Sequence, residues 1–177
     1  MAKKLSPSDW FRAAEDMLKE AGPQAVAIRE LSTALGVSTG SFYHHFRGRE
    51  DFVERFLDHW AEVSAEAASA LDGGETATLD ALNERVNELL DHRLEASIRA
   101  WGLFDPNVQS RLEVVDERRR KVLARLYRDH ASAEVAEQLA NLHLCSLAGA
   151  QFVFMNRPVK FRQFGRFVNQ CARTVVG

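Results

Sequence analysis

Apolar residues recur at every third or fourth position along almost the whole chain, and this spacing restricts the fold most strongly. Such a period places the apolar side chains on one face of an α-helix. The four prolines and most of the ten glycines fall between these stretches, where they end helices. No segment shows the alternation of apolar and polar residues that a half-buried strand requires. The sequence therefore predicts an all-α protein with about nine helices.

Composition narrows the class of protein further. With 177 residues and 46% hydrophobic content, the chain can bury a core without disulfides or metal. No run of 18 apolar residues occurs, which excludes a membrane-spanning helix. The first residues, MAKKL, lead directly into a helix signal, so we expect a cytoplasmic protein. Cys145 and Cys171 lie far apart without metal-like spacing, and we expect them to be small buried side chains. Neither a metal nor a cofactor is predicted.

Residues 27–46, AIRELSTALGVSTGSFYHHF, carry the most informative pattern. They predict one short helix from Ile28 to Leu35 and a second from Ser38 to Phe46. Between them Gly36 allows a tight corner because it has no Cβ. Two short helices joined in this way form a helix-turn-helix, the motif with which many proteins enter the major groove of DNA.

The second of these helices has two different faces. Phe42 and Phe46 are four residues apart and can dock on the preceding helices. The positions left for the solvent side are Ser38, Thr39, Gly40, Ser41, Tyr43, His44 and His45. Small polar residues and a glycine let the backbone approach base edges, whereas the longer side chains reach phosphates. The flanking basic residues are Arg29, Arg47 and Arg49, and residues 1–49 carry a net charge of +2 against −4 for the remainder.

The segment Arg29–Leu57, RELSTALGVSTGSFYHHFRGREDFVERFL, resembles the N-terminal DNA-binding domain of the tetracycline-repressor (TetR) family of bacterial regulators. The resemblance rests on the Gly-Val-Ser corner, the Gly-x-x-Tyr-x-His-Phe run and the basic-x-basic-Glu continuation. It extends over residues 6–66, and residues 67–177 resemble the family only in length and helical pattern. By this resemblance Tyr43, His45 and Arg49 match phosphate-contact positions. Thr39, Gly40 and Ser41 match positions against base edges, and Arg29 matches one that reaches a base or the backbone.

Two positions depart from the family pattern. Ala27 and Ile28 stand where the family commonly has a threonine, so the first motif helix lacks a cap worth about 1 kcal/mol. Thr39 stands where the family often has lysine, which removes one counterion-releasing contact and should flatten the salt dependence of DNA binding.

In this family the rear region binds a small ligand and forms a homodimer through the last two helices, and residues 67–177 are compatible with both. The candidate dimer residues are Leu139, Leu142, Leu147, Gly149, Phe152, Val153, Phe161, Phe164, Phe167 and Val168. The candidate ligand-binding residues are Trp60, His92, Trp101, Phe104, Tyr127, His143 and Gln151. Large or amphipathic side chains of this kind line ligand cavities, although each is also compatible with ordinary core packing.

Other features have simpler explanations. The run from Glu117 to Lys121 is basic, but pairs such as Asp116–Arg120 and Glu117–Lys121 predict a solvated, salt-bridged helix face. The pattern Asp58-His59-x-x-Glu62 recurs as Asp91-His92-x-x-Glu95 and is reminiscent of a di-iron bundle, although the order of ligands is reversed.

The sequence therefore predicts a homodimeric, ligand-responsive transcriptional repressor that binds a palindromic operator. The alternatives are an α-helical enzyme or metal-binding bundle and a helical adaptor that binds protein. The identity of the effector and the sequence of the operator are not encoded in any recognisable pattern.

Overall fold

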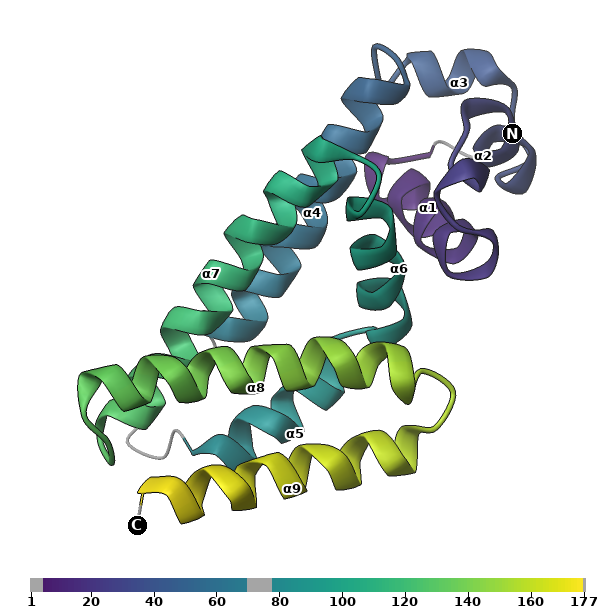
Figure 1. Cartoon of the computed structure of the whole chain (residues 1–177). Coiled ribbons are helices and arrows are strands. Elements are labelled where there is room, and N and C mark those ends of the chain that lie inside the picture. The colour runs from purple at the N-terminus through teal and green to yellow at the C-terminus, as the bar shows by residue number, and fades with distance from the viewer. Residues whose placement is uncertain (1–4, 70–77, 177) are drawn as a thin grey trace.

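The computed structural model describes residues 5–69 and 78–176, and in these residues it contains nine α-helices, one 3₁₀ turn and no strand (Figure 1). The elements are α1 (Pro7–Ala21), η1 (Pro23–Ala25), α2 (Ile28–Ala34), α3 (Thr39–Tyr43), α4 (Arg49–Ser69), α5 (Leu79–Leu89), α6 (His92–Gly102), α7 (Pro106–Arg128), α8 (Ala133–Val153) and α9 (Pro158–Val176). The predicted all-α class is confirmed. None of the helices in the described ranges is both long and apolar enough to cross a membrane.

Local sequence signals determine where several helices begin. Ser6 and Asp9 form a capping box at the start of α1, with the Ser6 N–H donating to Asp9 Oδ2 at 2.8 Å. Asp91 and Asp105 cap α6 and α7 by accepting backbone N–H groups with their carboxylates. Gly22 adopts a φ of 80° and ends α1, as the Gly-Pro pair predicts.

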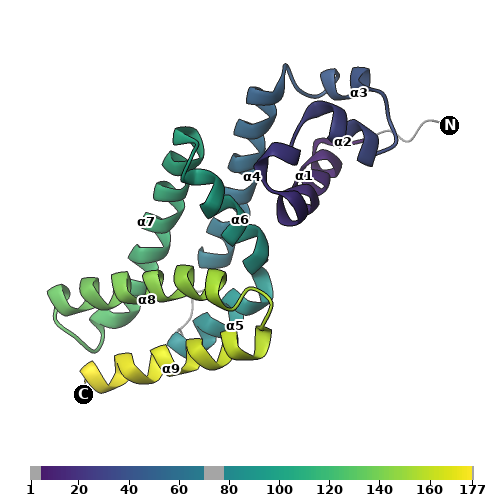
Figure 2. The same ribbon diagram turned by 45° about the vertical axis from the view of Figure 1, so that its right-hand side comes forward.

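The helices form two groups joined by long helices (Figures 1 and 2). Helices α1, α2 and α3 gather around the first turns of α4, and α6 packs against α1 on one side and α7 on the other. Helices α4 and α7 run side by side over much of their length. At the far end α8 and α9 lie against each other, with α5 packed on α9.

Two apolar cores correspond to these groups. The first is rich in aromatic rings and continues from α1 through α4 to α6 and the first half of α7; its largest members are Trp10, Phe11, Phe42, Phe46, Phe52, Phe56, Trp60 and Trp101. The second lies between α5, the last half of α7, α8 and α9, and includes Leu82, Leu123, Tyr127, Leu139 and Ala172. Helix α7 contributes to both cores, so it connects the N-terminal group mechanically to α8 and α9.

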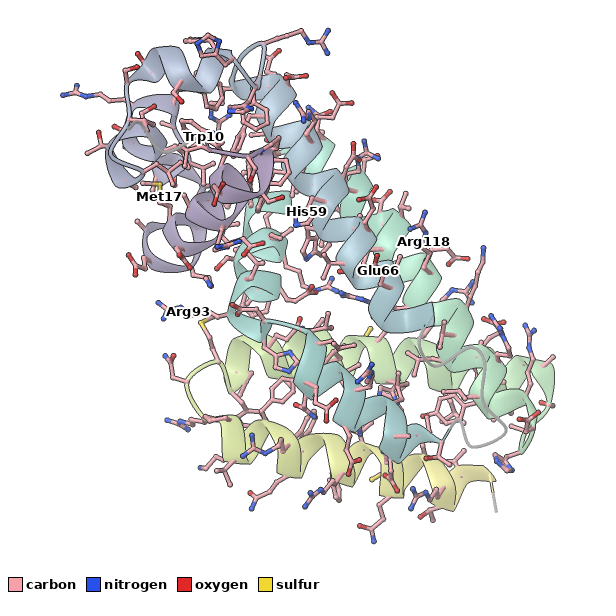
Figure 3. The ribbon with its side chains drawn as sticks, turned by 180° about the vertical axis from the view of Figure 1, so that it is seen from behind. Trp10, Met17, His59, Glu66, Arg93 and Arg118 are labelled. Atoms are coloured by element: carbon pink, nitrogen blue, oxygen red, sulfur yellow. The ribbon has the colours of Figure 1, made fainter. Side chains whose placement is uncertain are left out.

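Trp10 is the centre of the N-terminal group (Figure 3). Its ring is fully buried and lies edge-on to Phe42 at 5.4 Å and to Phe46 at 6.4 Å. Contacts of this geometry stabilise beyond the area that they bury. Phe42 is the only large apolar side chain that α3 itself inserts into this core, so it holds the short helix in place.

Replacing Phe42 by alanine should therefore lower the free energy of unfolding by about 3–5 kcal/mol, since it removes a fully buried ring. The neighbouring Tyr43 is 58% exposed, and its replacement by alanine should change stability by no more than about 0.5 kcal/mol. Urea denaturation of the two variants beside the unmodified protein measures both values. Equal losses for Phe42→Ala and Tyr43→Ala would contradict this description of α3.

Candidate nucleic-acid interface and internal cavities

The corner between α2 and α3 has the geometry that its glycine permits. Gly36 adopts a φ of 66°, in the left-handed region that side chains with a Cβ rarely enter. Its N–H donates to the Thr33 carbonyl at 3.1 Å, and the Val37 N–H donates to the Ser32 carbonyl at 3.0 Å. These bonds satisfy carbonyls at the end of α2 and direct the chain sharply into α3.

The two motif helices differ slightly from their predicted ends. Helix α2 ends at Ala34, one residue early, and α3 ends at Tyr43, three residues before Phe46. The backbone after α3 continues as a turn, in which the His45 and Phe46 N–H groups both donate to the Phe42 carbonyl. Arg55 Nη1 donates to the His45 carbonyl at 2.7 Å and fixes this turn against α4.

The predicted lack of a side-chain cap on α2 is confirmed, because Ala27 occupies the N-cap position. Arg49 holds the entry to this helix in another way: its Nε donates to the Val26 carbonyl at 3.1 Å. The residue that the resemblance assigns to phosphate contact therefore also anchors α2 to the start of α4.

One side of α3 faces solvent. Ser38, Thr39, Gly40, Tyr43 and His44 are exposed, and Ser41 and His45 are half-buried. An added Cβ on Gly40 would meet only Ser38 Oγ, at 3.5 Å. The described residues thus leave room above Gly40, where the polar surface of α3 is exposed.

Basic side chains surround this surface. Arg29, Arg47 and Arg49 are all exposed, on α2, in the turn before α4 and at the start of α4. Arg47 bonds Asp51 through its backbone N–H at 2.9 Å and its guanidinium at 3.1 Å, and these bonds lower the pKa of the Asp51 carboxyl. The arrangement places groups suited to base edges at the centre and groups suited to phosphates at the margin.

Two small adjoining cavities lie between α5, α7, α8 and α9. The first has a volume of about 50 Å³ and the second about 20 Å³, and Asn83, Val86, His143 and Leu147 line both. Of the predicted ligand-binding residues, His143 lines the cavities and Tyr127 hydrogen-bonds it, with the hydroxyl 3.1 Å from Nδ1. Burial lowers the pKa of His143 to about 4 and raises that of Tyr127 to about 12, so both are uncharged near neutral pH.

The other predicted ligand-binding residues lie elsewhere. Gln151 Nε2 lies 3.4 Å from His92 Nδ1, and the His92 ring packs on Phe161 at the edge of the second cavity. Trp60 and Trp101 belong to the first core. Phe104 is 89% exposed at the turn between α6 and α7, where its N–H donates to the Trp101 carbonyl at 3.0 Å, and it lines neither cavity.

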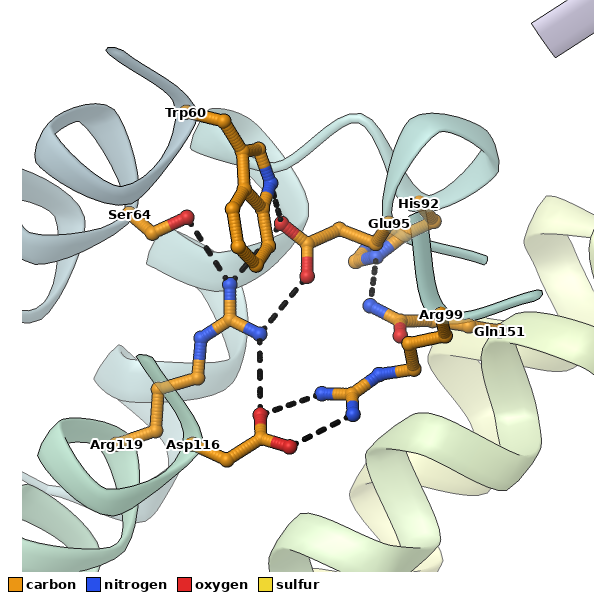
Figure 4. Close-up of polar contacts among 8 residues, drawn as sticks. All are labelled: Trp60, Ser64, His92, Glu95, Arg99, Asp116, Arg119 and Gln151. Carbon is orange, nitrogen blue, oxygen red and sulfur yellow. Dashed lines mark hydrogen bonds and ion pairs between the residues drawn. The ribbon is translucent and has the colours of Figure 1, made fainter. Parts of the chain in front are cut away.

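A buried ionic cluster forms part of the first cavity's wall (Figure 4). Arg119 donates to both oxygens of Glu95, at 2.8 and 3.0 Å, and to Ser64 Oγ at 3.2 Å. Trp60 Nε1 donates to Glu95 at 2.9 Å, and Arg99 pairs with Asp116 through two bonds of 2.6 and 2.7 Å. The cluster connects α4, α6 and α7.

Arg119 was not predicted to be buried. The Glu117–Lys121 pair forms as expected, but Asp116 turns to Arg99 and Arg119 instead of Arg120, which bonds Glu117 and Glu137. The sequence does contain a signal for Arg119: it falls at the apolar spacing set by Leu112, Val115 and Leu123. A charged residue in that register indicates a buried ion pair.

The repeated Asp-His-x-x-Glu patterns have separate structural roles. His59 stacks on Phe11 at 5.2 Å, where α4 meets α1 (Figure 3), and Asp58 pairs with Arg111 at 2.8 Å. Asp91 caps α6, and Glu95 belongs to the ionic cluster. No group of three potential metal ligands lies together in the described part of the chain.

The predicted dimer residues divide into two sets. Leu139 and Phe161 are buried inside the subunit, and Leu147, Phe164 and Val168 are half-buried around the cavities. The exposed members are Leu142, Gly149, Phe152, Val153 and Phe167. Cys145 and Cys171 are exposed as well, which corrects the expectation that they are buried: they lie on the outward sides of α8 and α9.

In this all-helical protein the exposed polar side of α3 is bordered by basic residues. Such an arrangement is typical of helix-turn-helix regulators. Residues 11–56 match the family described as bacterial regulatory proteins, tetR family. A 74-residue segment is 35% identical to the HTH-type transcriptional repressor KstR2 of Rhodococcus jostii (strain RHA1), covering 39% of this chain and 35% of that protein. A 47-residue segment is 34% identical to KstR2 of Mycolicibacterium smegmatis, covering 27% and 23%. The matched segments thus span about a third or less of these curated relatives.

Solved structures extend the likeness to the whole fold. A transcriptional regulator from Rhodococcus sp. Rha1 superposes with a TM-score of 0.78 at 20% identity, over 97% of this chain and 96% of that one. GusR of Salmonella enterica superposes with a TM-score of 0.74 at 21% identity, over 96% and 94%. Residues 11–56 thus carry the sequence pattern of the tetR family of bacterial regulatory proteins, and the chain shares its overall fold with solved transcriptional regulators.

The burial of His143 predicts a pH dependence of stability. Its pKa falls from 6.5 to about 4 on folding, so between these values the unfolded chain binds a proton that the folded chain does not. Stability is therefore lost as the pH falls through this window, by roughly 3 kcal/mol in total. Urea denaturation at pH 7 and at pH 4 measures the free energy of unfolding of the unmodified protein and of His143→Gln. Between pH 7 and pH 4 the unmodified protein should lose roughly 3 kcal/mol more stability than the variant does. A stability difference between the two proteins that is independent of pH would contradict the lowered pKa of His143.

Proposed function

We propose that this protein is a transcriptional repressor that binds a two-fold symmetric DNA operator as a homodimer and is released by a small molecule. The observation that carries the DNA-binding part is the exposed polar side of α3, whose opposite side is fixed by Phe42. Repression is supported by the two KstR2 relatives, which are named repressors.

Each α3 would enter one major groove, with Thr39, Gly40 and Ser41 toward base edges. Tyr43, His44 and His45 would lie beside the phosphates, together with Arg29 and Arg49. Two-fold symmetry then requires half-sites whose centres are about 34–36 Å apart, or slightly more. An effector would release the DNA by binding more tightly to an arrangement in which the two α3 helices no longer match this spacing.

Replacing Gly40 distinguishes a DNA-binding role of α3 from a purely structural role. Because a Cβ at this position meets only Ser38 Oγ at 3.5 Å, Gly40→Ala should leave the fold intact or stabilise it by up to about 1 kcal/mol. A methyl group between the backbone and a base edge should nevertheless weaken specific binding by about 1–3 kcal/mol. Titration of a duplex selected from a random pool, together with urea denaturation, measures both effects.

Thr33→Ala is a suitable control, because Thr33 is exposed on α2 and its hydroxyl bonds only its own helix, at the Arg29 carbonyl. This variant should bind the selected duplex as the unmodified protein does. If Gly40→Ala binds with unchanged affinity and specificity, or if the protein selects no duplex, a helical adaptor that uses the motif as scaffold becomes the better explanation.

The homodimer is supported by the apolar outward surface of α8 and α9. Leu142, Cys145, Gly149 and Phe152 follow one another at helical spacing along α8 and are all exposed. Phe167 and Cys171 form a second exposed row on α9. Exposed apolar side chains arranged in rows are typical of interaction sites, and the last two helices of two subunits would cover them as a four-helix bundle.

Leu142→Glu places a charge in this surface. If the surface is the dimer seam, the variant should raise the dimer dissociation constant by about a hundredfold or more, because the carboxylate loses its water without gaining a partner. Sedimentation equilibrium measures the change. Leu103→Glu is the matched control, since Leu103 is 75% exposed at the turn between α6 and α7, and it should leave the dimer intact. A monomeric unmodified protein, or a Leu142→Glu variant that dimerises normally, would refute the seam.

A further inference from the structure

The walls of the two adjoining cavities are mostly apolar. The first is lined by Leu82, Val86, Leu90, Val122, Leu123 and Leu147 among others, and the second adds Phe161 and Phe164. The polar side chains in the two linings are Ser64, Asn83, Asn87, Arg119, His143 and Ser146. Arg119 is the one charged residue among those that line either cavity in the described part of the chain.

The charge of Arg119 is already neutralised from the side away from the cavity. Both oxygens of Glu95 accept its hydrogen bonds, and Asp116 lies 3.8 Å away. Asp116 in turn pairs with Arg99, so the cluster contains two cations and two anions. A ligand carboxylate would therefore meet an arginine whose charge Glu95 already compensates, and it would gain little of the countercharge that its loss of hydration requires.

The remaining polar groups favour an uncharged partner. His143 is 7% exposed and lies on the shared wall of the cavities, where burial holds its pKa well below neutral pH. Asn83 is held by its bond to the Gly165 carbonyl, at 3.1 Å. Neither side chain offers a countercharge, and an ammonium group would meet only neutral dipoles beside a compensated arginine.

We infer that the effector is an uncharged, largely apolar molecule that occupies these cavities with one hydrogen-bonding group beside His143, and that carboxylates and amines of the same shape are excluded. This inference rests on the proposed function only in taking the cavities as the effector site. It adds the chemical class that the site selects.

The size of the cavities limits how such a molecule enters. The first, at about 50 Å³, is smaller than the cavity of about 150 Å³ that accommodates benzene in an engineered protein. A ligand larger than a few atoms must therefore move side chains of the lining, such as Val86 on α5 and Leu147 on α8. Slim, flexible molecules are the appropriate probes because they require the least displacement.

The test compares n-octanol, octanoate and octylammonium at pH 7, since these probes share one apolar chain and differ in charge. Isothermal titration with the 177-residue chain should show octanol binding about tenfold or more tightly than either charged probe, because only the charged groups lose hydration without a countercharge. Octanoate or octylammonium binding as tightly as octanol, or no binding of octanol, would overturn the inference.

Matched variants locate the binding. Val86→Phe fills the space shared by the two cavities and should abolish octanol binding, whereas Val114→Phe alters an exposed position on α7 and should leave it unchanged. Equal effects of the two would show that octanol binds outside the cavities and would overturn the assignment. Thermal denaturation of each variant establishes that it is folded, and Leu147→Phe replaces Val86→Phe if that variant is not.

Glu95→Gln tests the role of charge compensation. Removing this carboxylate leaves Arg119 with excess positive charge at the cavity wall, so the folded variant should bind octanoate at least about tenfold more tightly than the unmodified protein does. Unchanged octanoate affinity would contradict the argument. Binding of a selected DNA duplex by the unmodified protein, measured in parallel, separates the two claims. If the unmodified protein binds DNA but binds octanoate as tightly as octanol, only the effector class is refuted, whereas absence of DNA binding refutes the proposed function.

Discussion

The contact between Phe42 and Trp10 determines what the N-terminal group can present to a partner. Helix α3 has only five residues, too few to be stable alone, and its one fully buried side chain is Phe42. Inserting this ring beside Trp10 fixes the rotation of α3 about its axis. Thr39, Gly40 and Tyr43 must then face solvent, and Gly36 supplies the corner that makes the insertion possible. The reading surface is thus a consequence of aromatic packing on its opposite side.

A buried ionic cluster is the second interaction on which the structure depends, and it lies between the N-terminal group of helices and the cavities. Trp60 and Ser64 on α4 share the cluster of Glu95 and Arg119 with α6 and α7, and Arg119 also lines the first cavity (Figure 4). Breaking a buried ion pair costs several kcal/mol, so the three helices are held in one relative arrangement while the cluster is intact. Arg119 thus lines the cavity and also contacts, through Ser64, helix α4, which begins beside the DNA-binding motif.

The sequence predicted those features that depend on neighbours along the chain. Helical period and punctuation located the helices, and the Gly-Val-Ser corner with Phe42 four residues before Phe46 located the motif. Features that depend on distant partners were missed. Arg119 is buried because it forms an ion pair with Glu95 on another helix, and Phe104 is exposed because no other described residue covers it at the turn after α6. Periodicity identifies the buried face of a helix, but it does not identify which helix covers that face or whether a second subunit does.

The central claim is that paired α3 helices read duplex DNA. Hydroxyl-radical footprinting of the protein on a duplex selected from a random pool tests this claim most directly. Two symmetric protected patches, on one side of the duplex and about one helical turn or slightly more apart, are the predicted result. A single patch without symmetry, or protection that is uniform along every duplex, would contradict it.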